Sequence, residues 1–318
     1  MSKSFISIGE SVHASIPRTG KIMAELHGLG ERAFTEESEP LNYIKGLIES
    51  QAAEGAAYIA INVDAFGEDD PQVTVDMMVE YVKLVRKWGG GVPACIDSSN
   101  IEALIAGLKE WYSGEEKVAQ PLLNSIKVNT MDILMPLKKD YDFSFVAMLV
   151  DDDQLGDSAS EDPVGDLYRL AKSIFDPAVD KYGFKAEEVF FDTTAFPLAI
   201  DMPMNPGVSG FTYRTFETIK RIKSDPKMQN SHCSLGVTNS VRDLPGRKIG
   251  VARAYVEVAM RYGLDAGIVN VSHQFGGEKA ADADLIKLVE TFAVLDGSAE
   301  RTTDAMMMMG QFCVDNRK

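Results

Sequence analysis

The segment VPACIDSSN, residues 92–100, decides how this chain is interpreted. It begins as a short apolar run and ends abruptly in Asp97, Ser98, Ser99 and Asn100. A buried strand that delivers a carboxylate at its last position is typical of parallel sheets whose strand ends form a polar site. Similar apolar runs recur along the chain at residues 5–10, 58–64, 124–128, 143–151, 188–193, 233–239 and 266–272.

Stretches of helical periodicity separate these runs. The connection at 130–140 has the weakest helical pattern. Strand–helix units repeated eight times predict an α/β fold, a (β/α)8 TIM barrel forming a single domain over residues 1–318. An open doubly wound sheet is the alternative, but no Gly-rich dinucleotide fingerprint follows any run. The expected helices occupy residues 41–56, 71–88, 99–112, 163–182, 213–223, 247–263 and 280–296.

Nearly every expected strand ends on a polar side chain. The fourth run differs because Asn124 opens it, so we expect that strand to be PLLNSI, residues 121–126. In a barrel the carboxyl ends of all strands meet at one rim, so a ring of such residues predicts a polar pocket. The strand-end residues are Glu10, Asn62 with Asp64, Asp97, Asp151, Asp192, Asn239, and Asn270 with Ser272.

Composition narrows the class of protein. The chain has 48 acidic and 32 basic residues, a net charge of −16, which disfavours nucleic acids and anionic membranes as partners. It has no apolar run of bilayer length and no signal-like N-terminus, so we expect a cytoplasmic protein. Three scattered cysteines indicate reduced thiols, and four histidines make a metal site unexpected.

The residue types at the rim indicate the class of ligand. Carboxylates and amides dominate, and Arg18 and Arg247 are the nearby fixed cations on the expected loops. A phosphorylated ligand would favour more Lys and Arg. A carboxylate can accept two N–H groups at once, and an amide both donates and accepts, so this set suits a flat, uncharged heterocycle.

Five segments resemble the pterin-binding methyltransferases, in order and rough spacing along the whole chain. Among these the chain resembles stand-alone enzymes of anaerobic bacteria that exchange a methyl group between a separate corrinoid protein and tetrahydrofolate, as in O-demethylase and glycine-betaine systems. The resemblance also implies a homodimer. The matching segments are INVDAFGEDDP (61–71), PACIDSSN (93–100), LLNSI (122–126), FFDTTAFPLA (190–199) and LGVTNSV (235–241).

The resemblance implies a role for each matched residue. Asp97, Asn124 and Asp192 correspond to the residues that bind the pterin ring, and Asn239 to a mobile amide that reaches N5 of the folate. Asn239 and Asp192 are therefore the expected catalytic residues. Arg247 and Glu10 correspond to family positions close to the folate.

Two departures from the family pattern affect the first strands. The family often follows the first Glu with Arg-Ile-Asn, whereas this chain reads GESVHASIPRTG from residue 9. At the second strand either Asn62 or Asp64 can face the pocket, and Asn62 is included among the expected folate ligands. His13 is expected on the loop after the first strand.

The alternatives are a dihydropteroate synthase-like enzyme, a non-catalytic folate-binding subunit, and a structural role for the carboxylates. The segment at 247–250 is basic, but no Ser-Thr-Arg-Pro loop follows, which disfavours the synthase. Taken alone, Asp97 is better explained by capping the next helix, whereas the motifs taken together in order favour a ligand role. His273, in HQFG, lacks the Asp of the corrinoid-binding DxHxxG pattern. Fewer than 50 residues follow it, too few for an ordinary corrinoid domain, so the corrinoid is expected on a partner protein.

Overall fold

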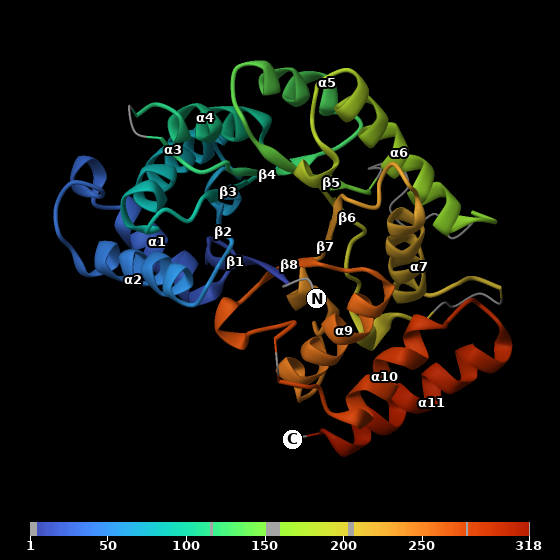
Figure 1. The fold of residues 1–318 in the computed structure, drawn as a ribbon. Coiled ribbons are helices and arrows are strands. Elements are labelled where there is room, and N and C mark those ends of the chain that lie inside the picture. Colours follow the sequence, from blue (N-terminus) through green and yellow to red (C-terminus); the bar gives the residue numbers. More distant parts are fainter. Residues whose placement is uncertain (1–4, 115–116, 151–159, 203–206, 278, 318) are drawn as a thin grey trace.

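The computed structural model describes residues 5–114, 117–150, 160–202, 207–277 and 279–317. Eight parallel strands form a central ring with helices around it (Figure 1). This confirms the predicted TIM barrel. The strands are β1 Ile6–His13, β2 Tyr58–Asn62, β3 Ala94–Asp97, β4 Leu122–Ile126, β5 Ser144–Met148, β6 Val189–Asp192, β7 His232–Ser234 and β8 Ala266–Val269.

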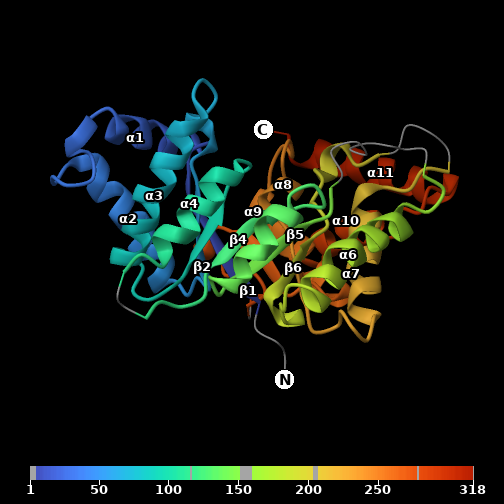
Figure 2. The same cartoon turned by 90° about the horizontal axis from the view of Figure 1, so that it is seen from above.

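The helices lie outside the ring, with α1–α4 on one side and α6–α11 on the other (Figure 2). The seven expected helices are present with small shifts at their ends. Helices α1 and α11 were not predicted, and residues 130–140 form only the short α5 and a 3-10 turn. The helices are α1 Pro17–His27, α2 Glu39–Ala53, α3 Pro71–Trp88, α4 Ile101–Trp111, α5 Met131–Leu134, α6 Pro163–Asp180, α7 Phe211–Ser224, α8 Val237–Ser240, α9 Lys248–Tyr262, α10 Ala283–Ala293 and α11 Ala299–Asp315.

Strand order is β7-β6-β5-β4-β3-β2-β1-β8, and each neighbour runs parallel. The ring closes between β7 and β8. There the backbone N–H of Ile268 donates to the carbonyl of Leu235 at 2.9 Å, and Gly236 forms an isolated bridge with Ile268. With three residues in β7, this is the sparsest seam of the sheet. Within the described ranges, no helix is long and apolar enough to cross a membrane.

Two apolar layers stabilise the barrel, one on each side of the sheet. The larger layer lies between the strands and the helices, where side chains such as Tyr81 and Tyr255 are fully buried. The smaller layer fills the inside of the barrel, because alternate residues of a strand face the same side. It comprises Ile8, Ala60, Cys95, Leu122, Val146, Phe190 and Ala266, seven residues from seven strands.

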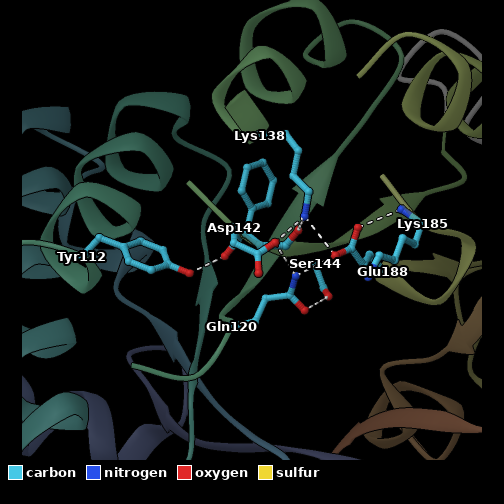
Figure 3. A network of polar contacts seen from close by, with 8 residues as sticks. Tyr112, Gln120, Lys138, Asp142, Ser144, Lys185 and Glu188 are labelled. Atoms are coloured by element: carbon cyan, nitrogen blue, oxygen red, sulfur yellow. Dashed lines mark hydrogen bonds and ion pairs between the residues drawn. The ribbon is translucent and has the colours of Figure 1, made fainter. Parts of the chain in front are cut away.

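A polar network lies at the amino-terminal ends of β5 and β6 (Figure 3). The ammonium group of Lys138 lies 2.7 Å from the carboxylate of Asp142 and 3.0 Å from that of Glu188. The side-chain amide of Gln120 donates to both carboxylates, at 2.9 and 2.8 Å. Ser144 Oγ donates to the amide oxygen of Gln120 at 3.1 Å. The network joins the segments that enter the two strands, at the end opposite the predicted pocket, which indicates a structural role.

Candidate functional site

The interior apolar layer determines which polar side chains enter the barrel mouth. On each strand, the next side chain on the inner face lies two residues beyond the apolar layer. The starting residues are Ile8, Ala60, Cys95, Leu122, Val146 and Phe190. All of the side chains reached in this way but one are polar. The sheet therefore gathers at one rim five of the ten residues that the strand-end pattern predicted. The residues reached are Glu10, Asn62, Asp97, Asn124, Met148 and Asp192.

Asp97 and Asn124 are direct partners in the pairing of β3 with β4. The Asn62 side chain hydrogen-bonds the carboxylate of Asp97. Desolvation at the barrel mouth raises the pKa of Asp97 to about 7, and the nearby carboxylates of Asp64 and Asp192 contribute to the rise. Asp97 is therefore a carboxyl group that exchanges its proton near neutral pH and gains from a ligand that donates to its charged form.

Hydrogen bonding indicates which of Asn62 and Asp64 faces the pocket. The carboxylate of Asp64 accepts from the backbone N–H of Ser99 at 2.7 Å, from its hydroxyl at 2.8 Å, and from the hydroxyl of Ser98 at 2.5 Å. Asp64 thus stabilises the loop after β3 and has its carboxylate occupied by that loop. The expected strand end at residue 64 is wrong, because β2 ends at Asn62 and Asp64 opens a 3-10 turn.

Helix capping does not account for Asp97. The N-cap of α4 is Asn100, whose side-chain oxygen accepts from the backbone N–H groups of Glu102 at 2.9 Å and Ala103 at 3.3 Å. These bonds satisfy two of the free amides at the start of the helix. Asp97 lies three residues earlier, as the last residue of β3, with its carboxylate bonded to Asn62.

Asn124 and Asp192 are buried, with 5% and 6% of their surfaces exposed. Oδ1 of Asn124 has no hydrogen-bond partner within the described residues. Burial raises the pKa of Asp192 to about 6, although the backbone N–H of Thr194 donates to the carboxylate at 2.7 Å. Ser234, the partner of Asp192 on β7, also has a buried hydroxyl without a partner among these residues. Buried polar groups left unpaired are the groups that a bound ligand would satisfy.

Asn239 does not end a strand, as the apolar run had indicated. β7 ends at Ser234, and Asn239 lies in the short helix α8 beyond it. Its side chain is exposed and makes no hydrogen bond to the described part of the chain. The preceding hydroxyl, on Thr238, donates to the carboxylate of Glu10 at 2.7 Å. The structure therefore places an unpaired amide next to a residue that contacts the rim.

Glu10 and Arg247, both expected near the folate, are bonded to other protein groups. Burial raises the pKa of Glu10, against the lowering effects of its bonds to Thr238 and to the backbone of Asn270. Arg247 precedes α9 and forms ion pairs with Asp282, at 2.6 Å, and with Asp284. Its charge is thus balanced within the protein, and its contact with folate stays a prediction.

His13 was expected on a loop but is the last residue of β1, where it pairs with Asn62. Its Nδ1 accepts from the backbone N–H of Ser15 at 3.1 Å, and burial lowers its pKa. The strand continues to His13 through an irregularity after Gly9, which the apolar pattern did not reveal. Asp151 lies outside the described residues. Among the described residues no cluster of three or more His, Cys, Asp or Glu side chains is arranged to hold a metal ion.

Comparison with known proteins identifies the fold and the family. The structure is similar to dihydropteroate synthase from Stenotrophomonas maltophilia, with a TM-score of 0.53 and 14% identity over 92% of this chain and 94% of that chain. It is also similar to the Yersinia pestis enzyme solved with a pterine-sulfa conjugate, with a TM-score of 0.54 and 12% identity over 91% and 93%. Identities this low show a shared fold. The sequence model of the pterin binding enzymes matches residues 33–270, three quarters of the chain, and the chain belongs to that family.

Proposed function

We propose that this protein is a methyltransferase that moves a methyl group between a methylated corrinoid protein and N5 of tetrahydrofolate. The observation that carries the proposal is the set of side chains at the barrel mouth. Asn124 and Asp192 offer buried acceptors, Asp97 offers a partly buried carboxylate, and Asn239 offers an unpaired amide at the rim. The pterin-binding unit is proposed to be the whole barrel, residues 1–318.

The chemistry of these groups fits an aminopyrimidinone ring. The carboxylate of Asp97 can accept two adjacent N–H groups of such a ring, which would favour its charged form. The unpaired Oδ1 of Asn124 can accept a further N–H from the same edge. Asp192 is proposed to accept from the second ring. An uncharged heterocycle with several donors would thus satisfy groups that the protein alone leaves without partners.

Methyl transfer from methyl-corrinoid to tetrahydrofolate is a displacement at carbon, in which the N5–C bond forms as the Co–C bond breaks and the cobalt keeps the electron pair. In the reverse direction N5 must leave as an amine. No protein nucleophile is needed, so alignment of the reacting groups and electrostatics decide the rate.

Asn239 is proposed to hydrogen-bond N5, because an amide can donate to a lone pair or accept from a protonated amine. Asp192, whose pKa of about 6 lies near physiological pH, is proposed to hold a proton close to N5 through water. The corrinoid is proposed to arrive on a separate protein, and the active protein to be a homodimer.

A dihydropteroate synthase activity is the second candidate, favoured by the solved structures of similar fold. That reaction needs cations for a diphosphate group. The basic segment at 247–250 contains Arg247, and this cation is already paired with Asp282 and Asp284. A folate-binding subunit without catalysis is the third candidate, and it would have no use for an unpaired amide on α8.

One experiment separates the three candidates. The protein is mixed with tetrahydrofolate and methylcobalamin or methylated corrinoid proteins, and the cobalt absorption bands are followed. Conversion to cob(I)alamin that requires both reactants is the expected result. Folate binding by calorimetry with no spectral change for any corrinoid substrate would favour the binding subunit. Product formation from a pterin diphosphate and p-aminobenzoate would favour the synthase.

A further inference from the structure

We propose that Glu10, Thr238 and Gly236 are positioning residues that hold the side chain of Asn239 in place for methyl transfer. This inference rests on the function proposed above, in which Asn239 acts at N5. It assigns Glu10 to the support of the turn that carries Asn239, in place of the direct folate contact that the family resemblance implies. Glu10 comes from β1, whereas Gly236 is the N-cap and Thr238 the second residue of the short helix that carries Asn239.

The turn that carries Asn239 is attached to the sparsest seam of the barrel. β7 has three residues, and its link to β8 includes the backbone hydrogen bonds of Ile268 to Leu235 and of Asp265 to Cys233 and the bridge at Gly236. Helix α8 follows at once and has four residues. A single turn of helix has little stability of its own, so its position depends on contacts with its surroundings.

Glu10 supplies such a contact across the seam. Its Oε1 accepts from the hydroxyl of Thr238 at 2.7 Å, and the carboxylate also accepts from the backbone N–H of Asn270. One side chain of β1 therefore connects the end of β8 with α8. A hydroxyl that donates to a carboxylate forms a stronger bond than one between neutral groups. The bond fixes the residue directly before Asn239.

Gly236 supplies the space that the amide occupies. A Cβ at this position would lie 3.0 Å from Nδ2 of Asn239, closer than ordinary contact. The backbone at Gly236 has φ −71°, which any residue can adopt, so conformational freedom is not the reason for glycine here. Since the Asn239 amide has no hydrogen bond to the described residues, the backbone held through Thr238 and the space left free at Gly236 determine where it lies.

The first test removes the hydrogen bond from Thr238 to Glu10, called the tether below, and measures folate binding and methyl transfer separately. Thr238→Val keeps the shape of the side chain and removes the hydroxyl, whereas Thr238→Ser keeps the hydroxyl. We expect the single-turnover rate of methyl transfer to fall about tenfold or more in Thr238→Val and to return to within about twofold of wild type in Thr238→Ser. Folate Kd is expected to change less than about threefold in both, because the ring is held by Asp97 and its neighbours. Gly236→Ala is expected to resemble Thr238→Val.

The second test asks whether the effect passes through Asn239. In an Asn239→Ala background, Thr238→Val and Gly236→Ala should cause no further loss of rate, since residues that act as a unit are not additive. Independent, additive losses would overturn the proposal. Thr303→Val, which removes a hydroxyl bonded to the carbonyl of Ala299 on the outer helix α11, is the matched control with unchanged activity.

A third measurement does not depend on methyl transfer. In protein labelled with 15N-asparagine, the side-chain NH2 signals of Asn239 are identified by their absence in Asn239→Ala. Thr238→Val should shift or broaden them, and Thr238→Ser should not. An unchanged signal in Thr238→Val would overturn the proposal whatever the reaction is. Altered signals in a protein that transfers no methyl group would instead refute the proposed function and leave the tether established.

Discussion

Asp97→Asn is expected to stabilise the ligand-free protein at pH 8 while removing folate binding. Burial raises the pKa of this carboxyl group from 3.8 to about 7. Above pH 7 the folded protein therefore holds a desolvated charge that the unfolded chain exposes to water, and a change of this size corresponds to about 4 kcal/mol. The amide removes the charge and still offers an oxygen to Asn62, so we expect a gain of about 2–4 kcal/mol in the free energy of unfolding at pH 8.

The gain must depend on pH with a definite sign. When the pH is below the unfolded value near 4, the carboxyl group is neutral in both states, and the substitution changes little. From there to about pH 7 the unfolded wild-type chain ionises while the folded protein does not, so wild type progressively loses stability relative to the variant. Urea unfolding should therefore show an advantage of the variant that grows by about 2.5 kcal/mol between pH 5 and pH 8.

A matched control uses a carboxylate that caps a helix and does not lie in the barrel mouth. Asp70 caps α3 by accepting from the backbone N–H of Gln72 at 3.0 Å, and an amide oxygen can do the same. Asp70→Asn should leave stability within about 0.5 kcal/mol at both pH values and should keep folate binding. If Asp97→Asn were less stable than wild type at pH 8, or if its gain were the same at pH 5, the carboxylate would not lie in a desolvating site.

Four further outcomes are expected. Asn239→Ala should raise the activation free energy of single-turnover methyl transfer by about 2–4 kcal/mol while folate Kd changes little. Unchanged turnover would show that this residue has no part in the mechanism. Asn124→Leu should weaken folate binding by about 1–3 kcal/mol in calorimetry without loss of thermal stability, because it replaces a buried acceptor that has no partner. Folate Kd should rise about tenfold per pH unit below pH 7, since Asp97 must release its proton to accept two N–H groups, and a flat profile would contradict this. Lys138→Met should destabilise the fold by about 3 kcal/mol with folate binding intact, since it removes the cation beside the carboxylate of Glu188, which is 11% exposed, and adding Glu188→Gln should recover part of the loss.

Much of the barrel could be predicted because its signal is local. Each strand is a short apolar run, and each strand–helix connection carries helical periodicity that can be counted residue by residue. The elements that were not predicted have weaker patterns. Helix α11 keeps Met306 and Met307 largely exposed, so its apolar residues do not mark a single buried face. The run at 233–239 continues the apolar pattern past the true end of β7, because Leu235 and Val237 are buried outside regular strand pairing.

The sequence by itself determined the order of the eight strand–helix units and the polar residues at their ends, since both follow from composition and spacing along the chain. Only the tertiary structure decided which of those residues share the mouth. Asn62 faces Asp97 while Asp64 braces the loop beside it, and Glu10 contacts Thr238 across 228 positions of sequence. The physical reason is that side-chain direction depends on strand register and on where each strand stops. Those features are set by closure of the whole ring, which no local stretch of sequence contains.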